Sequence, residues 1–176
     1  IDDEKKLSEL VDILKKVDSY VLHVDETELV ISPNLHDVYK LLIADSQRLI
    51  AFKEIFSDEN KTLIGHNVKS LITFLARHGI ELKNKLWDVM IAHYLIEPEL
   101  NHSLDYLRDI YTTNNGNIVW QLYEKFKSLL IENNLENLFY NIEMPLVRVL
   151  SKMESNGVKI DIEGLKQISD EQAKEI

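Results

Sequence analysis

The histidines of this sequence are scattered, and their spacing indicates no metal site or nucleophilic centre. Its 176 residues include six histidines and no cysteine, which excludes disulfides, zinc–thiolate sites and thiol catalysis. His93 and His102 lie on separate expected helices or in the loop between them, so we interpret them as surface or hydrogen-bonded histidines. Glycine-rich phosphate loops and the His-Glu-x-x-His and Gly-x-Ser-x-Gly motifs are absent, and no local signature supports a Ser/His/Asp triad.

The composition indicates one compact folded domain with an acidic surface. Hydrophobic residues make up 45% of the chain and charged residues 28%, and the formal net charge is −10. A domain this acidic does not hold nucleic acid strongly by releasing counterions, so another part of the molecule would do most of the holding. The apolar runs are too short to span a bilayer, and the acidic start lacks a signal-peptide layout. We therefore expect a cytoplasmic, monomeric domain without a membrane partner.

Hydrophobic periodicity predicts a small sheet followed by helices. The first part of the chain predicts a helix at 4–17, hairpin strands at 20–24 and 28–31, a helix at 35–44, a strand at 48–52, a short helix near 55 and a strand at 62–65. Such a mixture is typical of an α/β or α+β domain.

The second part of the chain is predominantly helical. Hydrophobic residues at helical spacing form a stripe over residues 68–76, which predicts a core-facing helix that ends at Gly79. A second stripe begins at Trp87 and predicts a helix that Pro98 ends, and Ser103 is placed to cap the next one. Further helices are expected at about 118–131, at 135–155 and after Asp161.

Several segments resemble bacterial family A DNA polymerases. Residues 65–69, Gly-His-Asn-Val-Lys, resemble the Gly-[Gln/His]-Asn-x-Lys motif of their 3'–5' exonuclease domain. Residues 79–82 and 87–98 are similar to its Gly-Ile-x-Leu turn and its Asp-Thr-x-x-x-x-Tyr-Leu-x-x-Pro helix, and residues 102–107 to its His-x-Leu-x-x-Leu stretch. Residues 142–161 resemble the segment that joins this domain to the polymerase thumb. The resemblance implies an α/β, ribonuclease H-like (DEDD exonuclease-like) fold with a reduced β-sheet flanked by helices.

The resemblance also implies a division of the chain. Residues 1–18 would form a linker helix from an upstream domain, and residues 19–140 the 3'–5' exonuclease-like domain. Residues 141–176 would form the junction and the first helices leading into the thumb, truncated. The partner would be the polymerase domain of the same chain, and DNA would be contacted mainly through that parent polymerase.

Exonucleases of this family hydrolyse phosphodiesters with two divalent metals, which carboxylates from three motifs hold. In the second motif, Asn-x-x-x-Asp, Asn67 matches, but Leu71 stands in the place of the aspartate. In the third, Tyr-x-x-x-Asp, Tyr111 matches and Asn115 replaces the aspartate. A turn that follows a helix explains residues 111–115 equally well.

The first motif, Asp-x-Glu, matches in two alternative registers. Asp25 follows an apolar strand as the family's aspartate does, but Thr27 stands where the glutamate belongs. A shifted register uses Glu26 and Glu28 instead. The plainer alternative is a polar turn between two hairpin strands.

At most one or two of the four ligands remain, so the comparison implies an inactive exonuclease with a structural role and no bound cofactor. The first alternative is an active, Mg²⁺- or Mn²⁺-dependent exonuclease with an unusual ligand set. Its candidate carboxylates are Asp25, Glu26, Glu28, Asp88 and Asp105, although Asp88 is better explained as a group that caps or orients its helix. The second alternative is a protein-interaction module, which would require a contiguous exposed apolar patch outside the polymerase-facing surface.

Overall fold

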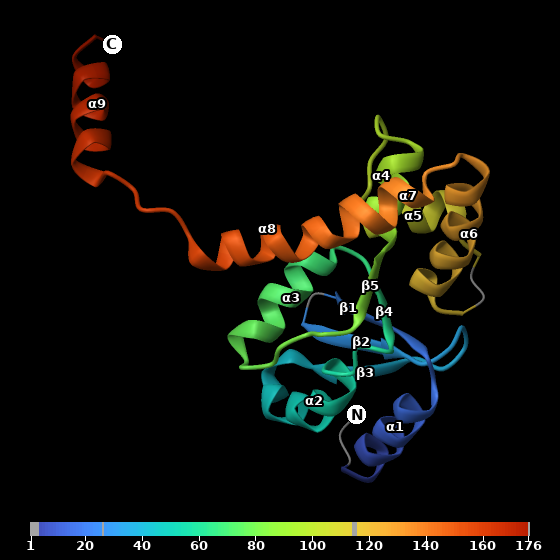
Figure 1. The fold of residues 1–176 in the computed structure, drawn as a ribbon. Coiled ribbons are helices and arrows are strands. Elements are labelled where there is room, and N and C mark those ends of the chain that lie inside the picture. Colours follow the sequence, from blue (N-terminus) through green and yellow to red (C-terminus); the bar gives the residue numbers. More distant parts are fainter. Residues whose placement is uncertain (1–3, 26, 114–115, 176) are drawn as a thin grey trace.

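The structure, a computed structural model, describes residues 4–25, 27–113 and 116–175, apart from the side chains of residues 25, 43–47, 174 and 175. Its centre is a five-stranded sheet with helices on its faces (Figure 1). The strands are β1 (Ser19–Asp25), β2 (Glu28–Ser32), β3 (Tyr39–Leu42), β4 (Thr62–Gly65) and β5 (Lys85–Asp88). They lie in the order β3-β2-β1-β4-β5, antiparallel from β3 to β1 and parallel from β1 to β5.

Helices make up most of the remaining chain. They are α1 (Glu4–Lys16), α2 (Lys53–Phe56), α3 (Val68–Arg77), α4 (Val89–Ile96), α5 (Leu104–Tyr111), α6 (Ile118–Glu132), α7 (Glu136–Leu138), α8 (Met144–Asn156) and α9 (Ile162–Glu175). A 3₁₀ segment, Ile43–Phe52, precedes α2, and a π-helical segment, Phe139–Glu143, connects α7 to α8. Within the described residues, no helix is both long and apolar enough to cross a membrane.

The core lies between the sheet and the helices that cover it. Tyr20 and Leu22 of β1 are fully buried, as are Leu10 of α1 and Phe56 of α2. The buried hydroxyl of Tyr20 donates a 2.7 Å hydrogen bond to the Asn84 side chain, so this polar group is satisfied inside the core. Burial of these large side chains is the main force that holds the sheet against its helices.

Helix α8 packs against this body, whereas α9 projects away from it (Figure 1). The hydroxyls of Thr73 on α3 and Ser151 on α8 lie 3.2 Å apart in the buried contact. At the rim, Lys69 and Glu154 form a 2.7 Å ion pair. The last long helix of the body therefore lies on α3.

Most of the expected elements are confirmed. The predicted hairpin forms, with Asp25 paired to Glu28. Helices α1, α3 and α6 lie where their hydrophobic stripes predict them, and Gly79 follows α3 with a φ of +72°. The Ser103 side chain accepts from the backbone of Tyr106 at the start of α5, as the capping prediction requires.

The predicted helix at 35–44 is wrong, because residues 39–42 form the edge strand β3. The Asn34 side-chain oxygen accepts from the backbone N–H groups of His36 and Asp37, both at 2.9 Å, and this turn redirects the chain toward β2. Pairing with β2 then supplies the backbone partners that a helix would have supplied internally.

Two further boundaries differ from the prediction. The strand expected at 48–52 is part of the 3₁₀ segment, in which Leu49 and Phe52 are buried while Ile50 is 63% exposed. A spacing of three residues suits a 3₁₀ turn and does not suit a strand. Trp87 belongs to β5, paired with Ile64 of β4, and the helix begins only after it.

Candidate functional site

The segment that matches the second motif forms a tight connection between β4 and α3. A Cβ atom on Gly65 would lie 2.9 Å from the Leu22 carbonyl oxygen and 2.9 Å from a Val68 methyl group, so only glycine fits there. Asn67 follows in the left-handed region with a φ of 54°. Its backbone N–H and that of Val68 donate to the Asp88 carboxylate at 3.1 and 2.7 Å.

The Asp88 carboxylate accepts hydrogen bonds from the N-termini of two helices. It also accepts from the backbone N–H of Met90 at 2.9 Å, so it caps α4 while it binds the first amides of α3. Burial raises the pKa of Asp88, and its backbone donors and nearby His66 work against that rise. The expectation that Asp88 caps its helix is confirmed.

A small depression lies beside this connection, at the C-terminal ends of β1 and β4. Its volume is about 280 Å³, and its lining residues are Val24, His66, Asn67, Ser70, Leu71 and Phe74. Leu71, in the place of the motif's aspartate, is 3% exposed and belongs to the apolar stripe of α3. Among the side chains that the structure describes, none that lines this depression supplies a carboxylate.

The residues of the first motif lie at the hairpin that joins β1 to β2. The backbone of Asp25 ends β1, its side chain is not described, and Glu26 lies outside the described residues. Thr27 is exposed in the turn. Glu28 begins β2, and its carboxylate forms an ion pair with the Lys40 ammonium group of β3 at 2.6 Å. This carboxylate therefore already has a cationic partner.

The tyrosine of the third motif belongs to a partly buried network of polar groups. The Tyr111 hydroxyl lies 3.2 Å from Nε2 of His93, whose Nδ1 lies 2.6 Å from Nδ1 of His102. The carbonyl oxygen of His102 is in turn 2.8 Å from Nε2 of His66. Asn115 lies outside the described residues. The structure thus places Tyr111 in a network with three histidines.

Burial governs the protonation of this network. His93 is fully buried, and burial together with the nearby His102 lowers the pKa of His93 to about 4. Burial also raises the pKa of Tyr111. His93 is therefore neutral at pH 7, with one ring nitrogen donating and the other accepting. The sequence analysis interpreted His93 and His102 as surface or hydrogen-bonded histidines. The structure shows that they are hydrogen-bonded to each other, a contact that no spacing pattern could indicate.

The candidate carboxylates do not come together in the described part of the chain. There, no group of three or more histidine, aspartate or glutamate side chains is placed to hold a metal ion. Asp105 is exposed on α5 and forms a 2.8 Å ion pair with Arg108. Asp88 accepts three backbone hydrogen bonds, and these occupy both of its oxygens.

The sheet defines the class of protein. An antiparallel hairpin and edge strand continued by two parallel strands, with helices on both faces, is the ribonuclease H-like arrangement. The catalytic core of RRP6 from Trypanosoma brucei superposes with a TM-score of 0.68 over 84% of this chain and 51% of its own, at 16% identity. The POL domain of Pol1 from M. smegmatis, in complex with DNA primer-template and dNTP, superposes with a TM-score of 0.78. This match covers 96% of this chain and 34% of that one, at 20% identity.

A family model described as 3'-5' exonuclease, of the DNA polymerase A type, matches residues 24–140. The chain therefore belongs to the 3'–5' exonuclease domain family of family A DNA polymerases. It is 28% identical to DNA polymerase I of Borreliella burgdorferi over 156 residues and to that of Bacillus subtilis over 151 residues. These matches cover 72% and 68% of this chain, and the chain spans 17% of the length of each relative.

Proposed function

We propose that this chain is the exonuclease-like domain of a bacterial DNA polymerase I, that it does not hydrolyse DNA, and that its role is structural. The relatives that its sequence resembles, at 28% identity, are DNA polymerases I, and they are several times longer than this chain. The domain would act in the cytoplasm within a replication or repair polymerase, and that polymerase would make most of the contacts with DNA.

Leu71 is the observation that carries the proposal of inactivity. A leucine side chain offers no metal ligand, and at 3% exposure this one belongs to the hydrophobic core. Two metal ions held a few ångströms apart repel each other, so they require several carboxylates to neutralise their charge. With Leu71 in this place and Glu28 paired to Lys40, too few of the expected ligands remain for the reaction.

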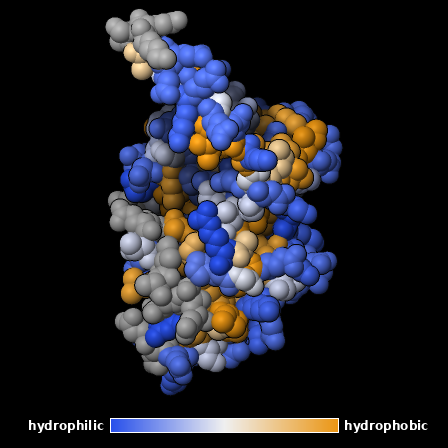
Figure 2. Space-filling view, turned by 90° about the vertical axis from the view of Figure 1, so that its left-hand side faces the viewer, coloured by the Kyte–Doolittle hydropathy of each residue, from blue (hydrophilic) through white to orange (hydrophobic). Residues whose placement is uncertain are grey.

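The two faces of α8 support a structural role. Its inner face is fixed to the body, where Arg148 donates to two backbone carbonyls and Ser151 contacts Thr73. Its outer face and the adjoining α9 expose large hydrophobic side chains, namely Leu146, Val149, Leu150, Met153, Ile162, Leu165 and Ile168. Figure 2, seen from the side on which α9 projects, shows hydrophobic surface among hydrophilic surroundings. We assign this surface to contact with the polymerase domain.

The proposed division of the chain follows from this assignment. Residues 1–18 would connect to an upstream domain, residues 19–140 would form the exonuclease-like body, and residues 141–176 would lead into the thumb of the polymerase. In this division α8 belongs to the junction by sequence while its inner face is bound to the body. The junction would thereby transmit the position of the body to the polymerase domain.

Degradation of a 5'-labelled single-stranded oligonucleotide tests the proposal. The chain and an Asp25→Ala variant purified in the same way are incubated with Mg²⁺ and, separately, with Mn²⁺. We expect no metal-dependent loss of 3' nucleotides from either protein. A ladder of shortened products that the unmodified chain makes and Asp25→Ala does not make would refute the proposal. It would establish the alternative, an active exonuclease with an unusual ligand set.

A further inference from the structure

A cleft of about 500 Å³ lies at the other end of the parallel strands, where β4 and β5 begin. Residues from β5, α6, the π-helical segment and α8 form its walls, although they are far apart in the sequence. The side chains that matter for its chemistry are Lys85, Trp87, Tyr123, Lys127, Tyr140 and Arg148. Nothing in the family's second motif contributes to this cleft, because that motif lies at the opposite strand ends.

The cleft is positively charged, although the chain as a whole has a net charge of −10. Lys85, Lys127 and Arg148 all line it, and its described lining contains no aspartate or glutamate. Glu124 and Glu81 are the acids that influence Lys127 and Arg148 electrostatically, but within the described residues no ion pair joins them to these cations.

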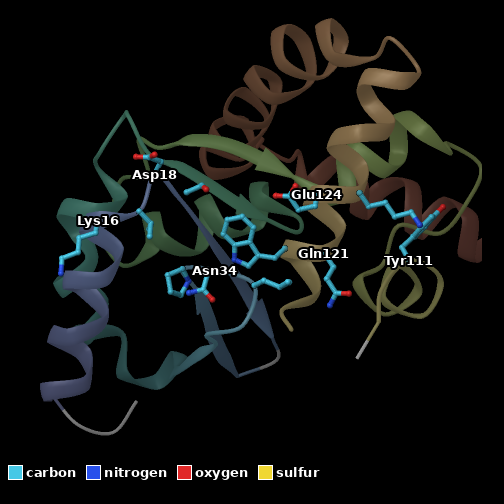
Figure 3. A pocket seen from close by; sticks show the side chains of 12 residues that line it. Lys16, Asp18, Asn34, Tyr111, Gln121 and Glu124 are labelled. Carbon is cyan, nitrogen blue, oxygen red and sulfur yellow. The ribbon is translucent and has the colours of Figure 1, made fainter. Parts of the chain in front are cut away.

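The larger depression in Figure 3 provides the contrast. It has a volume of about 960 Å³ and lies between the start of β1, the segment after β2 and helix α6. Its lining contains Lys16 and Lys125, but also Asp18 and Glu124, so positive and negative groups are balanced there. An excess of positive charge is therefore a property of the cleft and is not general to the hollows of this surface.

Arg148 is held in position before any ligand arrives. One Nη atom donates to the Leu82 carbonyl oxygen at 2.6 Å and the other donates to that of Asn84. Burial lowers the pKa of Arg148, but a guanidinium stays charged at pH 7. Its remaining N–H groups can donate to an anion, and a fixed guanidinium loses little side-chain entropy when it does so.

The aromatic side chains give the cleft a flat, apolar floor with polar edges. Trp87 is 2% exposed, and its indole N–H donates to the Tyr140 hydroxyl at 3.2 Å. The rings of Trp87 and Tyr123 are nearly perpendicular, with a centroid distance of 4.8 Å. Lys127 donates to the Tyr123 hydroxyl at 3.3 Å. Tyr140 is 42% exposed, so part of its ring is open to a ligand.

We propose that this cleft binds a phosphate ester that bears a flat ring, that is, a nucleotide, either free or as one unit of a single strand. Lys85, Lys127 and Arg148 contact the phosphate, and the exposed ring of Tyr140 contacts the base. Cations that surround an anion without competing carboxylates, next to an aromatic surface, are the combination that recognises this ligand class. The proposal holds whether or not the domain cuts DNA.

The two tryptophans, Trp87 and Trp120, provide the readout. Their indole N–H groups give separate signals in a ¹H–¹⁵N spectrum, because one donates to Tyr140 and the other to the Ser32 carbonyl. Titration of the chain with dTMP at low salt should shift the Trp87 signal saturably, with a dissociation constant of about 0.1–1 mM, and leave Trp120 unmoved. In the same titration, inorganic phosphate should bind about tenfold more weakly than dTMP, because it lacks the ring that contacts Tyr140.

Two variants on α6 form a matched pair. Lys127→Gln should weaken the binding of dTMP at least about fivefold, because it removes one of the three cations that contact the phosphate. Lys125→Gln, at an exposed position two residues earlier on the same helix, should change the affinity for dTMP less than about twofold, because Lys125 lies over Tyr111 in the other depression.

Three results would overturn the proposal. They are a Trp87 signal that does not shift, equal weakening by both variants, and equal affinity for phosphate and dTMP. Titration with a single-stranded oligothymidylate separates the two sources of the ligand. Tighter binding than dTMP assigns the site to a strand, and weaker binding per site assigns it to a free nucleotide.

Discussion

The two ends of the parallel strands differ in the chemistry of their side chains. At the C-terminal end, the described side chains that line the small depression beside Leu71 include no carboxylate, and the nearby carboxylate of Asp88 accepts hydrogen bonds from two helix N-termini. At the N-terminal end, a wider cleft gathers Lys85, Lys127 and Arg148 over aromatic rings. The same sheet frames both, so the fold supplies the positions and the individual side chains decide whether a ligand can be held.

Leu71→Asp should have the largest effect, because it puts a carboxylate into the apolar stripe of α3. The loss of buried hydrocarbon and the desolvation of the acid should lower the free energy of unfolding by about 3–5 kcal/mol. Urea unfolding followed by circular dichroism measures the change. Ser70→Asp, on the exposed neighbouring position that lines the same depression, should change stability by less than about 0.5 kcal/mol. Similar losses for both variants would mean that Leu71 is not part of the core.

Asp88→Asn should come next. The amide keeps the shape but replaces one acceptor oxygen by a donor that faces backbone N–H groups, and we expect a loss of about 2–3 kcal/mol. Asp105→Asn removes an exposed ion pair with Arg108 and should change stability far less, because water screens this pair. If Asp88→Asn were as mild as this control, the two helix N-termini would not depend on the shared carboxylate.

The histidine chain at the same end predicts a dependence of stability on pH. The folded state resists protonation of His93, whose pKa falls from 6.5 to about 4, while the unfolded chain takes up the proton below pH 6.5. The contribution of His93 to stability should therefore fall as the pH drops from 6.5 to 4 and level off below that. Solvent screening limits the expected loss to about 1–2 kcal/mol. Unfolding measured at several pH values in the unmodified chain and in His93→Phe checks this, and equal slopes would contradict it.

Arg148→Gln, at the cationic end, should have the smallest effect on stability. It removes the hydrogen bonds to the carbonyls of Leu82 and Asn84, and we expect a cost of about 1 kcal/mol by urea unfolding. Lys152→Gln on the exposed face of α8 should change stability by less than about 0.5 kcal/mol. A change as large as that of Leu71→Asp would indicate that the cleft is a structural joint and would weaken its assignment as a ligand site.

Local patterns in the sequence were sufficient for the elements that local forces determine. The stripe over residues 68–76 predicted α3, Gly79 predicted its end, and Ser103 and Asp88 were expected to cap helices. In each case a hydrophobic spacing or a cap acts within a few residues, and so the sequence can display it. The substitution of Leu71 in the second motif was equally visible, because the motif is defined within one helix.

Contacts between distant segments decided the rest. Residues 39–42 form a strand because β2 offers them backbone partners, and Trp87 belongs to β5 because β4 does the same. The neutral state of His93 depends on its burial and on the approach of His102, nine residues along the chain. The cleft joins Lys85, Lys127 and Arg148 from three elements, which no pattern in the sequence groups together. Hydrogen-bond pairing and charge proximity act through space, so only the tertiary structure could reveal them.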